Sequence, residues 1–149
     1  MPTEPSRPLR IAYFGLPLGA LLLTLDGHHL APCVLSPVAA PGLRRVKRVL
    51  GTRVLEANRV GTTLEREVEG ALERESPDLV VSWFWTRKLP VRWLERAPLG
   101  ALGVHPSLLP RHRGPNPYFW AIDAGDAETG VTVHRLEACL LYTSPSPRD

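Results

Sequence analysis

The stretch DLVVSWFW, residues 78–85, is an almost unbroken run of large apolar side chains, with Ser82 as the one polar exception after Asp78. A strand with one face in water alternates apolar and polar residues. A run without that alternation is typical of a strand covered on both faces, as in parallel sheets flanked by helices. The stretch therefore predicts a central, buried strand of an α/β sheet.

The segment before this strand has the clearest helical pattern in the chain, over residues 62–76. Thr62 and Glu65 have the spacing of a capping box, and Pro77 ends the helix. Four apolar residues fall on one helical face: Leu64, Val68, Ala71 and Leu72. The pattern predicts an amphipathic helix that packs against the sheet.

Further upstream, the pattern switches between apolar runs and helical spacing. RIAYFG (residues 10–15) predicts a buried first strand that ends at a glycine, and GALLLTLDGHH (19–29) predicts a short helix. APCVLSP (31–37) predicts a second strand, and GTRVLEAN (51–58) a third, weaker one. Strands and helices thus alternate from the start of the chain.

Downstream, the alternation continues. VRWLER (91–96) predicts a short helix and LGALGVH (99–105) a small buried strand. Residues 116–124 predict a helix with Pro117 in its first turn, and TGVTVHRL (129–136) alternates as a strand does. The order predicts an α/β fold with a Rossmann-like, mostly parallel sheet flanked by helices. Ligands bind such sheets at the carboxyl ends of the strands, where His105 lies.

Composition fits a globular protein without a membrane segment or metal centre. The chain has 149 residues, 44% hydrophobic and 22% charged, and a net charge of +3 that favours an anionic ligand or RNA only weakly. Cys33 and Cys139 have no metal or redox spacing, and Cys33 is expected to be a packed thiol. No apolar run reaches the roughly 18 residues of a membrane span, and the start lacks a signal core. We expect a cytoplasmic protein with no bound metal and no DNA or membrane partner.

Several short sequence motifs of this chain occur together in one known family. They are HPSLLPRHRG (105–114), GDAETGVT (125–132), PDLVVS (77–82) and an aromatic pair before LP. In this order they resemble the folate-dependent formyltransferases, the methionyl-tRNA formyltransferases above all, from about Leu9 to Ala138. The resemblance implies the amino-terminal catalytic domain of that family. It also implies 10-formyltetrahydrofolate as co-substrate and a primary amine as acceptor, first of all that of initiator methionyl-tRNA.

Three segments follow from this resemblance. Residues 1–8 are expected to be a disordered start, and residues 9–138 the formyltransferase domain, truncated in its last third. Residues 139–149, CLLYTSPSPRD, resemble one reading-frame translation of a transposon adapter used in sequencing libraries, and are expected to be non-native. The alternative is a natural Ser/Pro-rich tail.

The resemblance assigns the catalytic role to His105, whose imidazole would handle the proton of the attacking amine. The family uses a triad of Asn, His and Asp. Its Asn position falls on Gly103, and its Asp position on Leu141 in the adapter-like tail. Losing one oxyanion donor costs about 10²- to 10³-fold in rate. The family's Asp would orient and charge the histidine. Because that carboxylate is missing as well, we expect the chain as given to be inactive.

The resemblance places the pterin slot along SWFWTRKLP (82–90). If the strand continues, Trp83, Phe84 and Trp85 alternate faces, so at least one but not all would line the slot. The turn formed by Ser107, Leu108, Leu109 and Pro110 would shape the wall beside the formyl group. For the two leucines, a purely structural loop role is the preferred alternative.

Basic residues predict contacts with anionic groups. Arg111 and Arg113 suit a carboxylate or phosphate of the folate or the acceptor. Exposed loop arginines are more often just solvated, so the two interpretations are weighted equally. LRRVKR (43–48), with Arg53 close by, is the densest basic cluster. It would contact the tRNA acceptor end or simply form an exposed helix face, and the second interpretation is slightly favoured.

Three other functions stay open. An amino-sugar or glycinamide ribonucleotide formyltransferase would use the same formyl donor and have similar sequence motifs. A non-catalytic folate- or ligand-binding member would explain Gly103. An RNA-binding module is disfavoured, because the aromatic residues cluster away from LRRVKR. The sequence does not indicate an oligomeric state.

Overall fold

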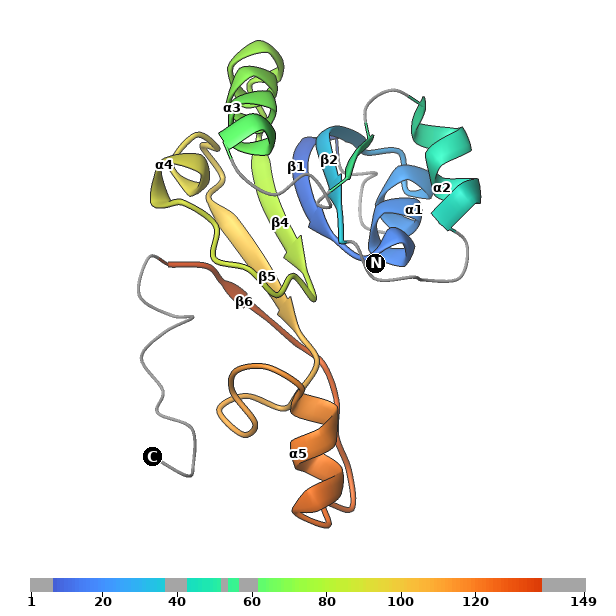
Figure 1. The fold of residues 1–149 in the computed structure, drawn as a ribbon, viewed down its shortest axis with the longest axis vertical. Coiled ribbons are helices and arrows are strands. Elements are labelled where there is room, and N and C mark those ends of the chain that lie inside the picture. The colour runs from blue at the N-terminus through green and yellow to red at the C-terminus, as the bar shows by residue number, and fades with distance from the viewer. Residues whose placement is uncertain (1–6, 37–42, 52–53, 57–61, 138–149) are drawn as a thin grey trace.

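A computed structural model describes residues 7–36, 43–51, 54–56 and 62–137. Its centre is a six-stranded sheet with strand order β3-β2-β1-β4-β5-β6 (Figure 1). The strands are β1 (Arg10–Gly15), β2 (His29–Leu35), β3 (Val54–Glu56), β4 (Leu79–Trp83), β5 (Ala101–His105) and β6 (Thr132–Arg135).

The sheet is parallel except at one edge. Strands β1 to β5 all pair in parallel, whereas β6 runs antiparallel to β5. The predicted mostly parallel Rossmann-like sheet is therefore confirmed. Its carboxyl ends meet where Gly15 pairs with Trp83 and where Trp83 pairs with Val104.

Helices cover both faces of the sheet. Helices α1 (Pro17–Leu25) and α2 (Leu43–Leu50) lie on one side, and α3 (Thr62–Glu75) and α4 (Val91–Leu94) on the other (Figure 1). A fifth helix, α5 (Pro117–Asp123), lies beyond the ends of β5 and β6. The side chains of β1 alternate between two cores: Ile11 and Tyr13 pack with residues of α1 and α2, and Ala12 and Phe14 with residues of α3 and α4. Because both faces are covered, β1 is buried from its second residue to its end.

The predicted face of α3 is confirmed: Leu64, Val68, Ala71 and Leu72 are all buried. The side chain of Thr62, on which the capping box depends, lies outside the described residues. A charged face ties α3 to α4, because the Glu69 carboxylate accepts hydrogen bonds from Arg92 Nε at 2.6 Å and from Trp93 Nε1 at 3.2 Å.

Two element boundaries differ from the prediction. The helix predicted over 19–29 spans Pro17–Leu25, because proline suits a first helical turn and Gly27, at φ +91°, leaves the helical conformation. His29 then begins β2 by pairing with Arg10. The strand predicted over 78–85 ends at Trp83, because Phe84 has a positive φ of 53°.

The basic cluster LRRVKR lies in α2, where Val46 and Leu50 are buried and Arg44, Arg45 and Arg48 are exposed. The cluster therefore forms an exposed helix face, and a contact with the tRNA acceptor end stays a prediction. Arg53 lies outside the described residues. Burial raises the pKa of the Cys33 thiol to about 12, as expected for a packed core cysteine. Within the described residues, no helix is long and apolar enough to cross a membrane.

Candidate functional site at the carboxyl ends of β4 and β5

His105 is the last residue of β5, half-buried at the rim of the sheet. Its Nε2 lies 3.0 Å from the carbonyl oxygen of His112, in the loop that follows the strand. A carbonyl oxygen only accepts, so this contact assigns the proton to Nε2 and leaves Nδ1 with a free lone pair in the neutral ring. The ring is thus fixed in orientation and can accept a proton.

Phe84 lets two consecutive aromatic residues face the same site. Its left-handed backbone, at φ 53°, breaks the alternation of β4 while its N–H still donates to the Val104 carbonyl at 3.1 Å. Consequently Phe84 and Trp85 both line the pocket beside His105. Trp83 does not reach it: its ring packs against Gly19 on the opposite face of the sheet, with the α1 side of the core. The sequence prediction of a pterin contact from Trp83 is not supported by this placement.

The pocket has a volume of about 330 Å³, within the usual range for small-ligand sites. Its walls combine apolar and aromatic side chains with basic ones. The described residues that line it are Ser82, Phe84, Trp85, Thr86, Arg87, Lys88, Gly103, Val104, His105, Pro106, Gly114, Pro115, Asn116, Pro117, His134 and Leu136. No carboxylate is among them, so the lining suits a ligand that carries negative charge.

These residues fit a flat heteroaromatic ring such as a pterin. Phe84 and Trp85 supply aromatic surface, and the buried indole N–H of Trp85 donates no hydrogen bond to a described residue. A buried donor without a partner costs about 1–3 kcal/mol. A ligand acceptor that reaches the indole would recover that cost.

The turn after His105 is held together internally and lies away from the pocket. Ser107 is fully buried and its Oγ donates to the Arg111 carbonyl at 2.8 Å. Thr132 Oγ1 donates to the Ser107 carbonyl at 2.7 Å and accepts from the Leu109 N–H at 3.1 Å. Pro106 lines the pocket, but Ser107, Leu108, Leu109 and Pro110 do not. These four support the loop in this structure, and a folate contact from them stays a prediction.

The arginines of the loop also lie outside the pocket lining. Arg111 Nη1 is 3.5 Å from Asp126 Oδ1, and His112 Nε2 is 2.6 Å from Asp126 Oδ2. The hydrogen bond from His112, helped by the charge of Arg111, holds the pKa of the Asp126 carboxyl below its usual range. Asp126 therefore braces the loop whose His112 carbonyl orients His105. An anion contact from Arg111 or Arg113 stays a prediction.

This brace predicts a pH-dependent contribution to stability. Asp126→Asn should lower the melting temperature at pH 7. A carboxyl with a depressed pKa stabilises the fold above its ordinary pKa of about 3.9 and loses that contribution as the pH falls through its folded value. The melting temperatures of the variant and the parent should therefore approach each other as the pH falls below the ordinary pKa of the carboxyl. Glu128→Gln, on an exposed residue of the same loop, is the matched control. A difference in melting temperature between variant and parent that persists in acid would contradict a stabilising role for the ionised Asp126.

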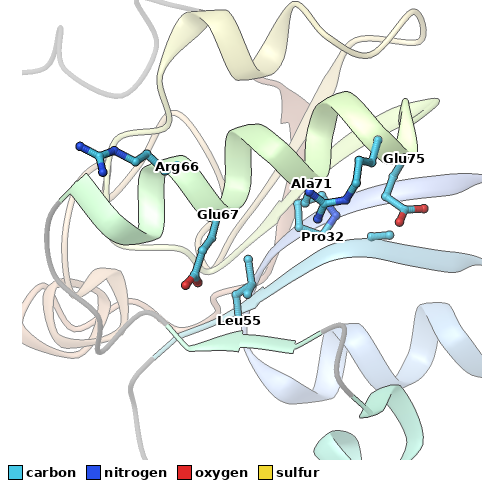
Figure 2. Close-up of a pocket in the computed structure, with 8 residues that line it drawn as sticks. Pro32, Leu55, Arg66, Glu67, Ala71 and Glu75 are labelled. Carbon is cyan, nitrogen blue, oxygen red and sulfur yellow. The ribbon is translucent and has the colours of Figure 1, made fainter.

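A second hollow, of about 370 Å³, lies between α3 and strands β2 and β3. Figure 2 shows Arg66, Glu67, Ala71 and Glu75 on α3 beside Pro32 and Leu55 of the strands. Its charged lining is mixed, and it contains none of the residues that the sequence predicted for the catalytic or binding site. It also lies away from the carboxyl ends of β4 and β5. We therefore place the candidate site at His105.

Several lining residues were missed by sequence reasoning, above all His134 and Asn116. His134 reaches the pocket because β6 pairs antiparallel with β5. The residue types of the two strands do not indicate this register. Asn116 caps α5 with a left-handed φ of 55°, a conformation that asparagine adopts readily. Leu141, the predicted position of the catalytic carboxylate, lies outside the described residues.

Comparison with known proteins identifies the family of the chain. The formyl transferase family model matches residues 34–140. The chain belongs to the formyl transferase family. Two relatives named methionyl-tRNA formyltransferase, from Anaeromyxobacter dehalogenans and Thermus thermophilus, are 34% and 35% identical, and each comparison covers 87% of this chain and 45% of the relative. The chain thus spans about half the length of these formyltransferases.

Solved structures show the same family at the level of the fold. Glycinamide ribonucleotide transformylase 1 from Symbiobacterium toebii superposes with a TM-score of 0.66 at 25% identity, over 89% of this chain and 68% of that one. The resemblance read from HPSLLPRHRG and GDAETGVT is therefore confirmed for the family and for its fold.

Proposed function

We propose that this chain provides the folate-binding and proton-transfer part of a formyltransferase, which moves a formyl group from 10-formyltetrahydrofolate to a primary amine. One observation carries the proposal. A fixed imidazole, His105, lies at the rim of a pocket with aromatic walls, and none of the described residues that line it is a carboxylate. The aromatic residues suit the pterin, and Arg87 and Lys88 suit the carboxylates of the folate tail.

The chemistry assigned to His105 is proton transfer. When the amine nitrogen bonds to the formyl carbon, that nitrogen must lose a proton and N10 of the carrier must gain one as its bond to carbon breaks. In the neutral ring, the lone pair on Nδ1 of His105 can take up the first proton and return it to N10, because Nε2 is already committed to the His112 carbonyl. Each proton is thereby accounted for, and no metal is needed for the transfer.

The proposed acceptor is methionyl-tRNA. The relatives that match 87% of this chain carry that name. The exposed arginines of α2 offer phosphate contacts to an RNA acceptor. A glycinamide ribonucleotide acceptor is the second candidate, because the solved structure from S. toebii carries that name at 25% identity. The two candidates are separated by offering methionyl-tRNA and glycinamide ribonucleotide to the same enzyme and measuring which acceptor becomes formylated.

Binding of 10-formylfolate, a stable oxidised form of the carrier, tests the folate site directly. The 149-residue chain should bind it, with quenching of tryptophan fluorescence from Trp85. Phe84→Asn should weaken binding about tenfold, as expected for loss of one aromatic platform. Asparagine tolerates the left-handed backbone that position 84 requires, so the melting temperature should change little.

The matched control is Phe119→Asn, because Phe119 is an exposed aromatic residue of α5 outside the pocket lining. Equal loss of affinity in the two variants, or no binding by the parent chain, would contradict a folate site at Phe84.

A further inference from the structure

Gly103 faces His134 directly across the β5–β6 ladder. A side chain at position 103 would collide with its neighbours, because an ideal Cβ there would lie 2.8 Å from His134 Nε2 and 2.9 Å from Leu136 Cδ2. The space in which an asparagine side chain would begin is therefore filled by the His134 imidazole. Both Gly103 and His134 line the candidate pocket.

The hydrogen bond of His134 determines what its ring presents to the pocket. Nδ1 lies 2.9 Å from the carbonyl oxygen of Arg135. Because that oxygen only accepts, Nδ1 carries a proton, and Nε2 is the atom left over Gly103. The neutral ring offers a lone pair at Nε2. The imidazolium offers an N–H donor there without giving up the bond to Arg135.

His105 and His134 lie on the same face of the sheet. His105 pairs with Thr132 and Gly103 with His134, so the two histidines are diagonal neighbours across the ladder. Such neighbours are typically about 7–8 Å apart, and their Cβ atoms are somewhat closer. This separation leaves room for one small reacting group between them. A formyl group in the pocket would have an imidazole on each side.

We propose that the His134 imidazolium is a second catalytic residue, whose Nε2–H donates to the formyl oxygen in place of the amide that Gly103 lacks. This inference rests on the proposed formyl transfer. Negative charge develops on the formyl oxygen when the amine attacks, and a charged donor stabilises it more than a neutral amide does. His105 keeps the proton transfer between amine and N10, so the bonding and proton balance of the reaction are unchanged.

The proposal predicts a pH dependence of binding with a definite sign. Affinity for 10-formylfolate should fall about tenfold or more as the pH rises from about 5.5 to 8.5, the range over which histidine ordinarily loses its charge, since a hydrogen bond from a charged donor is lost. Among the described residues, the other titratable side chains lining this pocket are His105, Arg87 and Lys88. The effect of His105 is separated by a variant at each histidine.

The experiment combines imidazole NMR with binding of 10-formylfolate between about pH 5.5 and 8.5, the range over which histidine titrates. The ligand should move the titration midpoint of His134 to higher pH and leave that of His29, at the far end of the sheet, unchanged. His134→Gln, which keeps a neutral donor, should bind with little dependence on pH. His134→Ala should bind about tenfold more weakly at low pH.

A rescue variant tests the substitution itself. Gly103→Asn alone should bind poorly, because the new side chain meets the His134 ring. Gly103→Asn combined with His134→Ala should recover binding without the pH dependence. If 10-formylfolate shifts His105 but not His134, the role of His134 is refuted and the folate site stands. If neither ring responds, the proposed function fails and this inference fails with it. Should the alanine variants not fold, the titration of the parent and of His134→Gln decides.

Discussion

Replacing His105 by alanine should lower the rate of formyl transfer by about 10²- to 10⁴-fold, the usual contribution of a positioned proton-transfer group. The expected loss follows from the position of the ring at the end of β5 and from its fixed contact with the His112 carbonyl. Alanine removes the group that accepts the amine proton but leaves the pocket walls in place. Affinity for 10-formylfolate should therefore change far less than turnover.

The rate of formyl transfer is measured on a protein of the relatives' full length, because this chain spans about half of that length. A chimera in which residues 7–137 replace the matching part of the Thermus thermophilus relative provides it. Formylation of methionyl-tRNA is compared between the chimera, its His105→Ala variant and a His29→Ala control outside the pocket lining. Equal rates for the parent chimera and His105→Ala would refute the assignment. A chimera that binds 10-formylfolate but forms no product would favour the non-catalytic alternative that Gly103 raises.

The sequence predicted the parts of the fold that depend on local patterns. The apolar run that begins at Leu79 marked β4 as a buried strand, and the helical spacing of Leu64, Val68 and Leu72 marked the buried face of α3. His105 was placed at a strand end by the apolar residues before it, and the structure has it there. Burial on both faces and one-sided burial each leave their own periodicity, which is why these predictions succeeded.

The sequence did not contain the parts of the site that depend on register or on a single backbone torsion. Phe84 would alternate with Trp85 in an ideal strand, and only its positive φ brings both rings to the pocket. Likewise, the contact of His134 with the space above Gly103 depends on how β6 aligns with β5, and a shift by one residue would turn that ring to the opposite face. Neither torsion nor register produces a pattern in residue type.

Gly15→Ala should destabilise the fold by about 3 kcal/mol or more, which places it among the most disruptive single substitutions. Gly15 ends β1 between two other strands, paired with Leu35 on one side and Trp83 on the other. An ideal Cβ at this position would lie 2.1 Å from the Trp83 carbonyl oxygen. The obstacle is backbone rather than a flexible side chain, so β1 and β4 would have to separate at the edge where the pocket begins.

The measurement is chemical denaturation of the parent and of two matched glycine variants. Gly15 and Gly27 both have a positive φ, of 155° and 91°. A Cβ at Gly27 would meet no atom within 4 Å, so Gly27→Ala measures the cost of a positive φ without a collision, about 1–2 kcal/mol. Gly70→Ala lies in α3, where alanine is favoured by about 1 kcal/mol and the one near contact is the mobile end of Arg74 at 3.2 Å. The predicted order of stability is therefore Gly70→Ala, parent, Gly27→Ala, Gly15→Ala. If Gly15→Ala proved no worse than Gly27→Ala, the close approach of β1 to β4 would be wrong, and with it the position of the Trp83 backbone beside Gly15.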